Sequence, residues 1–244
     1  MNSIVLIHGF PFDHRMWDAL SPSLKWRALA WDLPGAGAAR GFESPEDYSI
    51  AGYAASEIGV LDLLKEQAVI CGFSMGGYIV FELLRRFPDR VRAAILCNTK
   101  ATADTPEAKR GRDALAARTR KEGMSAVADE LVNRLVARVT REQRPEVVRE
   151  VTKLILRQPV PGILGALRAM RERPDSTPLL GQIRVPVLVV AGDDDQIAPA
   201  EGMEAMARAI PGAQFVLIPQ SGHLSPLEQP KAVSAALNAF LGQL

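Results

Sequence analysis

The chain has 244 residues, of which 48% are hydrophobic and 23% are charged, and its formal net charge is +1. This composition is that of a globular protein and excludes a disordered chain, and the length fits one large domain or a core with an insert. The balanced charge does not indicate a nucleic-acid partner, and no apolar run approaches the roughly 18 residues of a membrane span. The start of the chain lacks signal-peptide features, and Cys71 and Cys97 cannot form a disulfide framework. We therefore expect a cytoplasmic protein with two reduced, buried thiols.

Short apolar segments alternate with longer helical ones over most of the chain. The predicted strands are 4–7, 27–31, 68–71, 93–96, 185–190 and 214–218. The predicted helices between them are 50–65, 75–87, 201–209 and 231–241. Because the strand segments are apolar on both faces, this βαβ pattern predicts an α/β fold with an open, mostly parallel sheet covered by helices on both sides.

One stretch, from about residue 102 to 177, contains no predicted strand. Its periodicity predicts helices at 106–122, 125–139, 142–156 and 162–171, separated by glycines and prolines. We therefore predict a helical cap, 102–177, inserted into a core made of 1–101 and 178–244. Residues 100–180 hold 17 of the 29 basic and 11 of the 28 acidic residues, a net of +6, which leaves −5 for the rest. Arginines on solvated helix faces are the simplest interpretation of this charge.

The strongest local motif is Gly72-Phe73-Ser74-Met75-Gly76, which lies between a predicted strand and a predicted apolar helix. A sharp strand-to-helix turn presents one side chain to solvent and requires small residues two positions before and after it. Gly72 and Gly76 meet this requirement, so Ser74 is the candidate nucleophile. The N-terminus of the following helix favours negative charge that develops beside the serine.

A serine nucleophile needs a general base and an acid that orients the base. His223 follows the last predicted strand, where α/β sheets place their sites, and is the candidate base. We assign His8 a structural role in holding the loop that follows it, and His14 either lines the entrance or faces solvent. The acid candidates after the strand at 185–190 are Asp193, Asp194 and Asp195, with Asp104 as a further alternative. Spacing alone does not choose among the three consecutive aspartates.

Acyl transfer through a serine creates an oxyanion, which preorganised N–H donors stabilise. The backbone amide of Met75, directly after the nucleophile, is one candidate donor. The second is the amide of Phe10, because Gly9 lets the loop after the first strand approach closely. The sequence contains no histidine cluster with metal-ligand spacing and no phosphate-binding loop, so we expect neither a metal nor a nucleotide cofactor.

Together these elements, in the order oxyanion loop, serine, acid and histidine, resemble the α/β-hydrolase superfamily. The segments that resemble its small esterase and 3-oxoadipate enol-lactonase-like branch are His8-Gly9-Phe10-Pro11 with Trp17, Asp32-Leu33-Pro34-Gly35, Gly72-Phe73-Ser74-Met75-Gly76-Gly77 and Gly222-His223. The resemblance implies about six parallel strands, since the chain starts directly at the strand before His8. It also selects Asp195, because the acid of this branch is the third residue after the glycine that ends the strand, here Gly192.

The resemblance implies a serine hydrolase that cleaves small carboxylic esters through an acyl-enzyme on Ser74. A lactonase, a carbon–carbon bond hydrolase, a perhydrolase and a non-catalytic ligand receptor are alternatives on the same fold. Relatives often carry polar residues in the loop after Gly35, where this chain has Ala36-Gly37-Ala38-Ala39. We therefore expect this loop to lack its usual polar contacts and to be more mobile. The sequence leaves the oligomeric state open.

The predicted helix at 125–139 carries an apolar stripe that bears on the choice of substrate. Its members are Val127, Leu131, Leu135 and Val139, with Arg134 and Arg138 beside it. This pattern predicts apolar walls for the pocket under the cap. We therefore expect neutral short-chain esters to be better substrates than carboxylate-bearing lactones.

Overall fold

The computed structural model describes residues 2–64 and 67–244. Six strands form one parallel sheet in the order β2-β1-β3-β4-β5-β6. The strands are β1 (Ser3–Ile7), β2 (Arg27–Ala30), β3 (Ala68–Phe73), β4 (Val91–Cys97), β5 (Val187–Gly192) and β6 (Gln214–Ile218). The prediction of an open parallel sheet of about six strands is confirmed.

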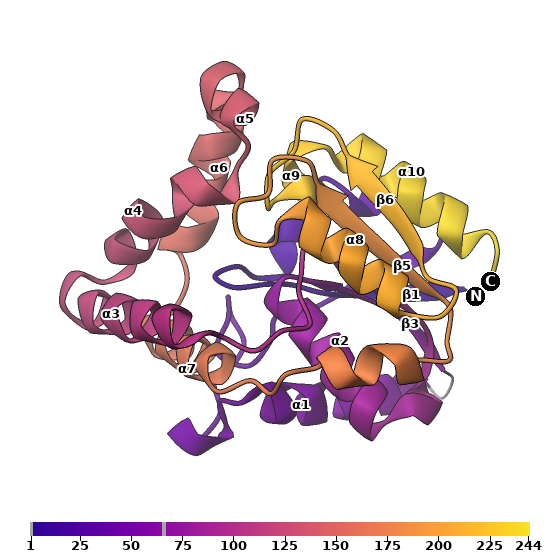
Figure 1. The fold of residues 1–244 in the computed structure, drawn as a ribbon. Coiled ribbons are helices and arrows are strands. Elements are labelled where there is room, and N and C mark those ends of the chain that lie inside the picture. The colour runs from indigo at the N-terminus through magenta and orange to yellow at the C-terminus, as the bar shows by residue number, and fades with distance from the viewer. Residues whose placement is uncertain (1, 65–66) are drawn as a thin grey trace.

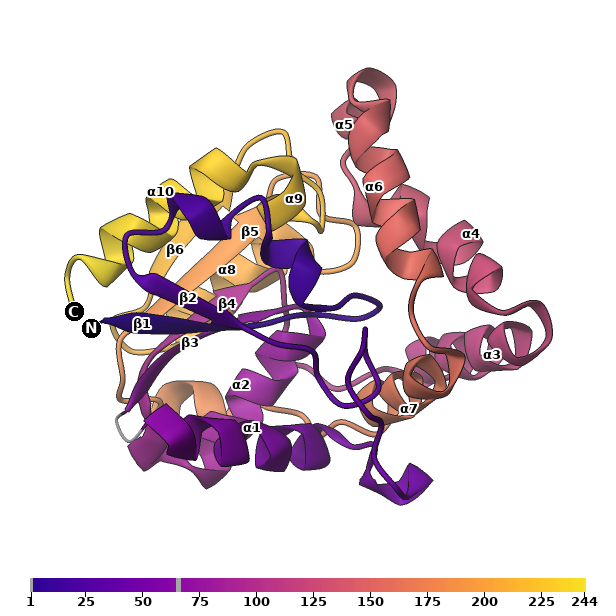
Figure 2. The ribbon, with the colours of Figure 1, turned by 180° about the vertical axis from the view of Figure 1, so that it is seen from behind.

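Helices cover both faces of this sheet. They are α1 (Ile50–Leu64), α2 (Met75–Arg86), α8 (Ala200–Ala209), α9 (Ser225–Glu228) and α10 (Pro230–Leu241). Helices α9 and α10 lie on one side and α1 and α2 on the other (Figures 1 and 2), while α8 packs against β5 and β6. Every residue of β3 and of β5 is buried, which explains why both strands are continuously apolar in the sequence. The last residue of the helix predicted at 50–65, Lys65, lies outside the described residues.

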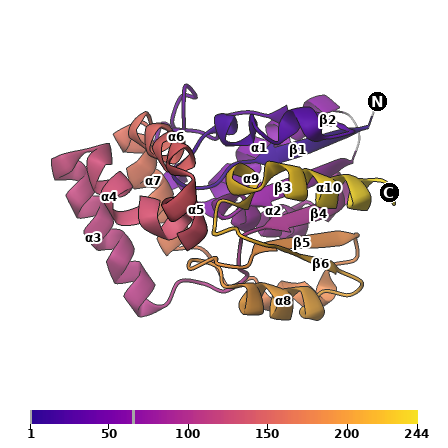
Figure 3. The ribbon, with the colours of Figure 1, turned by 90° about the horizontal axis from the view of Figure 1, so that it is seen from above.

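Five further helices stand beyond the carboxyl ends of the strands (Figure 3). They are α3 (Pro106–Glu122), α4 (Met124–Leu135), α5 (Arg138–Gln143), α6 (Pro145–Leu156) and α7 (Val160–Arg171). Helix α3 packs against α4 and α7, and α4 packs against α6. We call residues 106–171 the helical segment. It faces the edge of the sheet at which the loops after β1, β3, β4, β5 and β6 gather.

The prediction of a helix at 125–139 is wrong at its C-terminal end, because α4 ends at Leu135. The carbonyl of Leu135 accepts a hydrogen bond from the amide of Leu224 (3.0 Å), and the amide of Ala137 donates to Oε2 of Glu228 (2.8 Å). Backbone groups that would continue the helix are thus bonded to the segment after β6. Val139 therefore belongs to α5 and does not extend the apolar stripe of α4.

Prolines account for the other differences in the helical segment. The helix predicted at 142–156 is divided, because Arg144 adopts a non-helical conformation (φ −132°, ψ 62°) immediately before Pro145. Helix α7 begins at Val160, two residues earlier than predicted, because Pro161 is tolerated in the first turn of a helix. The division of the chain into a core and a cap at 102–177 stays a prediction.

The loop after β2, whose residues 36–39 carry no polar side chains, is hydrogen-bonded through its backbone. The amide of Ala38 donates to Oδ2 of Asp32 (2.9 Å), and the amide of Gly37 donates to Oε1 of Gln158 (2.9 Å). Nε2 of Gln158 in turn donates to Oδ2 of Asp13 (2.6 Å). One glutamine thus joins the helical segment to the loops after β1 and β2.

Gly162, in the first turn of α7, lies too close to the loop after β2 to carry a side chain. A Cβ at this position would lie 1.8 Å from the carbonyl oxygen of Gly35. We expect Gly162→Ala to push the helical segment away from the core and to lower the free energy of unfolding by about 1–3 kcal/mol in urea titrations. The control is Gly202→Ala in α8, where a Cβ meets nothing within 4 Å and should stabilise the helix by about 0.5–1 kcal/mol. A Gly162→Ala protein as stable as wild type would contradict this contact.

Glu57 of α1 is a buried acid whose ionisation opposes folding. Its Oε1 accepts a hydrogen bond from Nε1 of Trp31 (3.2 Å), and its Oε2 has no partner among the described residues. Burial raises the pKa of Glu57 to about 7, against an opposing effect of the Trp31 bond. The folded protein therefore holds the proton of Glu57 more tightly than the unfolded chain does. Protonated Glu57 contributes to the free energy of unfolding below about pH 4.5, and this contribution is lost as the pH rises through 7.

We expect Glu57→Gln to remove this pH dependence. Between pH 5 and pH 8 the free energy of unfolding of the variant should rise relative to wild type by about 2–3 kcal/mol, since one pKa unit corresponds to about 1.4 kcal/mol. Urea unfolding of both proteins at several pH values measures the difference. A difference that is the same at pH 5 and pH 8 would show that Glu57 does not titrate in this range.

Candidate active site

Ser74 lies at the turn between β3 and α2, with the unusual backbone angles φ 50° and ψ −110°. The turn packs so closely that side chains are excluded on both sides of the serine. A Cβ on Gly72 would lie 2.4 Å from the carbonyl oxygen of Gly76, and a Cβ on Gly76 would lie 2.4 Å from that of Ile7 in β1. The two glycines are therefore required for the turn that presents Ser74.

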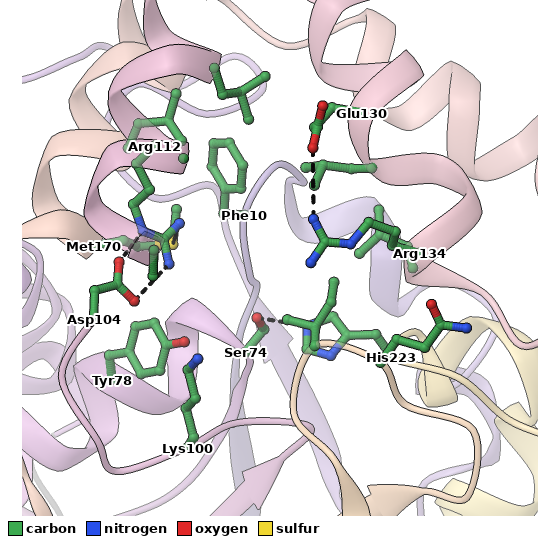
Figure 4. A pocket seen from close by; sticks show the side chains of 18 of the residues that line it. Phe10, Ser74, Tyr78, Lys100, Asp104, Arg112, Glu130, Arg134, Met170 and His223 are labelled. Atoms are coloured by element: carbon green, nitrogen blue, oxygen red, sulfur yellow. Dashed lines mark hydrogen bonds and ion pairs between the residues drawn. The ribbon is translucent and has the colours of Figure 1, made fainter. Parts of the chain in front are cut away.

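The structure brings Ser74 together with His223 and Asp195. Oγ of Ser74 lies 2.8 Å from Nε2 of His223, and Nδ1 of the same ring lies 2.8 Å from Oδ2 of Asp195 (Figure 4 shows the first contact). All three residues are buried. With Nδ1–H donating to the carboxylate, Nε2 is left to accept the hydroxyl hydrogen of the serine. This arrangement can remove a proton from Ser74.

Asp195 is held by several donors besides the histidine. Its Oδ1 accepts hydrogen bonds from the amides of Ile197 (2.8 Å) and Ala198 (2.9 Å), and Nδ2 of Asn98 donates to Oδ2 (3.0 Å). Burial raises the pKa of Asp195, but the charge of His223 and the hydrogen bonds from His223, Ala198 and Asn98 together hold it below the usual range. The carboxyl is therefore ionised and fixed in orientation.

The two neighbouring aspartates, Asp193 and Asp194, accept hydrogen bonds from backbone amides and not from His223. Asp193 accepts hydrogen bonds from the amides of Gln220 (2.9 Å) and Ser221 (3.0 Å), in the loop before His223. Asp194 accepts one from the amide of Arg138 (2.7 Å), at the start of α5. The structure thus gives the three consecutive carboxylates three different sets of partners.

Three polar residues that support this site were missed in the sequence. Asn98, at φ 46°, donates to Asp195 and accepts a hydrogen bond from Oγ of Ser225 (2.5 Å). Oγ1 of Thr99 donates to the carbonyl oxygen of Ser74 (2.7 Å), at the sharp turn. A detectable signal existed for two of them, because Asn98 and Thr99 are polar residues directly after the apolar run Ala93–Cys97.

A buried carboxylate links the loop of His223 to the helical segment. Oε1 of Glu228 accepts a hydrogen bond from the amide of Gly222 (2.8 Å), and Oε2 accepts from the amide of Ala137 (2.8 Å) and from Oγ1 of Thr140 (2.6 Å). Burial raises the pKa of Glu228, although these hydrogen bonds act in the opposite direction. The residue before His223 and the junction of α4 with α5 therefore share one acceptor side chain.

The two amides expected to bind an oxyanion belong to Phe10 and Met75. Met75 is the first residue of α2, so its N–H has no acceptor within the helix. The amide of Phe10 is bonded to no acceptor in the described part of the chain. Gly9 brings this loop against the turn of Ser74, since a Cβ there would lie 2.6 Å from the ring of Phe73. Both N–H groups are thus available near the serine.

The other two histidines lie outside this arrangement. Nε2 of the buried His8 accepts a hydrogen bond from the amide of Leu33 (2.9 Å), and its Nδ1 contacts the carbonyl of Gly9 (3.1 Å). Burial lowers the pKa of His8, so its ring is neutral and joins the loops after β1 and β2. His14 is hydrogen-bonded to Asp32.

His14, Asp32 and Asp13 lie close enough together to be considered as metal ligands in the described part of the chain. The carboxylate of Asp13, however, already accepts hydrogen bonds from Arg15 and Gln158.

A cavity of about 430 Å³ opens above Ser74 and His223, between the core and the helical segment. Its apolar wall includes Leu131 and Leu135 of the predicted stripe. The expectation of apolar walls describes only part of the cavity, because charged side chains also line it (Figure 4). Arg134 lies 3.7 Å from Glu130, and Arg112 is paired with Asp104. Asp104, the alternative acid, therefore belongs to an arginine cluster.

These features define an α/β hydrolase. Residues 2–230 match the family of the alpha/beta hydrolase fold, and the chain belongs to this family. It is 29% identical to a pimeloyl-[acyl-carrier protein] methyl ester esterase of Neisseria meningitidis over 99% of this chain and 94% of that protein. It is 28% identical to 3-oxoadipate enol-lactonase 2 of Acinetobacter baylyi over 89% of this chain and 79% of that protein.

Solved structures agree with this assignment. A thermophilic esterase from Thermogutta terrifontis, with malate bound, is 40% identical with a TM-score of 0.95, over 100% of this chain and 90% of that one. The enol-lactonase from Burkholderia xenovorans is 30% identical with a TM-score of 0.90, over 99% of this chain and 91% of that one. Within the described residues, no helix combines the length and the apolar character that a membrane crossing requires.

Because the three aspartates have different partners, we expect their replacement by asparagine to have different effects on activity. Asp195→Asn should lower kcat for ester hydrolysis by roughly 10⁴-fold, because an asparagine favours the wrong tautomer of His223. Asp194→Asn retains a side-chain oxygen that can accept the hydrogen bond from the amide of Arg138, so it should lower kcat less than about 10-fold. Initial rates on p-nitrophenyl butyrate provide the measurement. Loss of activity in Asp194→Asn or Asp193→Asn, with Asp195→Asn active, would overturn the assignment of the acid.

Proposed function

We propose that the protein is a serine hydrolase of small carboxylic esters, with Ser74 as nucleophile, His223 as general base and Asp195 as the orienting acid. The observation that carries this proposal is the continuous set of hydrogen bonds from Oγ of Ser74 through the His223 ring to Asp195, at the floor of a cavity. Relatives named as esterases and enol-lactonases support the same class of reaction. The helices of residues 102–177 act as a cap over the site in this proposal.

The reaction proceeds in two acyl-transfer steps. His223 takes the proton of Ser74 as Oγ attacks the ester carbonyl carbon, and the amides of Phe10 and Met75 stabilise the negative charge on the former carbonyl oxygen. The imidazolium, stabilised by Asp195, then gives its proton to the leaving alcohol oxygen. A water molecule, deprotonated by His223, hydrolyses the acyl-enzyme and restores Ser74. No step requires a metal or an organic cofactor.

A lactonase is the second candidate, and the enol-lactonase relatives favour it. The same steps open a lactone, except that the alcohol formed stays attached to the acyl group. Carbon–carbon bond hydrolysis and perhydrolysis use the same groups on other substrates. A ligand receptor would bind in the cavity without turnover, which a direct test of the nucleophile separates from all of these.

The test of the nucleophile is Ser74→Ala, with Ser125→Ala as its matched control on an exposed helix position. Ser74→Ala should lower the rate on p-nitrophenyl butyrate by about 10⁴-fold or more, because loss of the nucleophile removes the acyl-enzyme route. Ser125→Ala should keep the wild-type rate. A fluorophosphonate should add one label to wild type and Ser125→Ala and none to Ser74→Ala, as judged by intact mass.

Comparable melting temperatures of the three proteins are required for this comparison. A Ser74→Ala variant that keeps more than about one part in a thousand of the wild-type rate would refute the proposed nucleophile. A wild-type protein that neither turns over esters nor reacts with the fluorophosphonate would favour the receptor.

A further inference from the structure

One cation in the cavity beside Ser74 has no charge partner of its own. Lys100 follows β4 and is half-buried, and its side chain points into the end of the cavity that also holds Tyr78 (Figure 4). Among the described residues, no carboxylate lies within ion-pair distance of its ammonium group and no acceptor is hydrogen-bonded to it. The paired arginines on the cavity wall, Arg112 and Arg134, differ from it in this respect.

The charged groups nearest to Lys100 are bonded to one another and not to the lysine. The buried Arg173 lies 2.6 Å from Asp104, and Arg112 contacts the same carboxylate. The guanidinium of Arg173 also stacks over the Tyr78 ring, 4.2 Å from its centroid. Asp104 is therefore shared by two arginines, and Asp195, the other carboxylate that acts on Lys100, is bonded to His223. Burial lowers the pKa of Lys100, and the positive charges of Arg173 and Arg112 lower it further, although Asp104 and Asp195 oppose this effect.

The chemistry of the reaction places the acyl group at this end of the cavity. The carbonyl oxygen must face the amides of Phe10 and Met75, and the leaving oxygen must face Nε2 of His223. Figure 4 shows His223 and Arg134 on one side of Ser74, and Tyr78 and Lys100 on the other. The alcohol thus leaves on the His223 side, and the acyl chain extends toward Lys100.

We propose that Lys100 binds a carboxylate at the far end of the acyl group, so that the substrates are monoesters of short dicarboxylic acids. A single free ammonium matches a monoanion better than a phosphate dianion, and the buried hydroxyl of Tyr78 is available as a second donor beside it. A bound carboxylate would give Lys100 a charge partner and favour its protonated form. This inference rests on the proposed function, and it replaces the expectation that neutral esters are the better substrates.

The test compares monomethyl and dimethyl esters of succinic, glutaric and adipic acid, which share their acyl chains and differ in terminal charge. We expect wild type to hydrolyse at least one monomethyl ester with kcat/KM about 10–100-fold above that of its dimethyl ester, the range of one charge-assisted hydrogen bond. Lys100→Met should remove this preference and change kcat/KM for the dimethyl esters less than about threefold. Lys100→Arg should keep part of the preference, and Lys121→Met, at an exposed position of α3, should keep all of it.

The substrate pairs separate this inference from the proposed function. Hydrolysis of both kinds of ester with no preference in wild type, or an equal loss on both kinds in Lys100→Met, overturns the role of Lys100 and leaves the esterase intact. No hydrolysis of either kind by wild type refutes both proposals. Lys100→Gln is the second variant if Lys100→Met does not fold, and the same loss of preference is expected from it. A preference that decreases with added salt supports the charge interaction.

Discussion

The close packing of the β3–α2 turn against β1 is the contact on which the site depends. Gly76 lies so near the carbonyl of Ile7 that the first turn of α2 rests on the end of β1. This contact fixes the distance between the amides of Met75 and Phe10, which belong to segments more than 60 residues apart in the sequence. In the same turn Ser74 has a positive φ, and surrounding contacts, such as the hydrogen bond from Thr99 to its carbonyl oxygen, hold it there.

Most of the fold could be predicted because its signals are local. The buried strands β3 and β5 are apolar at every position, and the turn at Ser74 needs glycines at fixed spacing. Helix ends were predictable only where a proline or glycine marks them. The end of α4 was not, because its cause is a pair of hydrogen bonds to Leu224 and Glu228, nearly 90 residues further along the chain.

The same distinction applies to the site. Ser74 and His223 could be proposed as nucleophile and base from a short motif and a short list of histidines. The choice among the three adjacent aspartates required a resemblance, because these residues differ only in their tertiary partners. Lys100 follows Asn98 and Thr99 at the end of β4, but the sequence does not show that it lacks a charge partner. That depends on tertiary pairing, since Asp104, the carboxylate near it, is shared by Arg112 and Arg173. Formal charge along the chain does not reveal which cations are neutralised.

The buried carboxyl of Glu228 couples the helical segment to the loop of His223. Its two oxygens accept from the amides of Gly222 and Ala137, so either segment can separate from Glu228 only if one of these buried oxygens loses its hydrogen bonds. Local opening of the α4–α5 junction therefore exposes the histidine loop at the same time, and the two amides should exchange their hydrogens with solvent at matching rates.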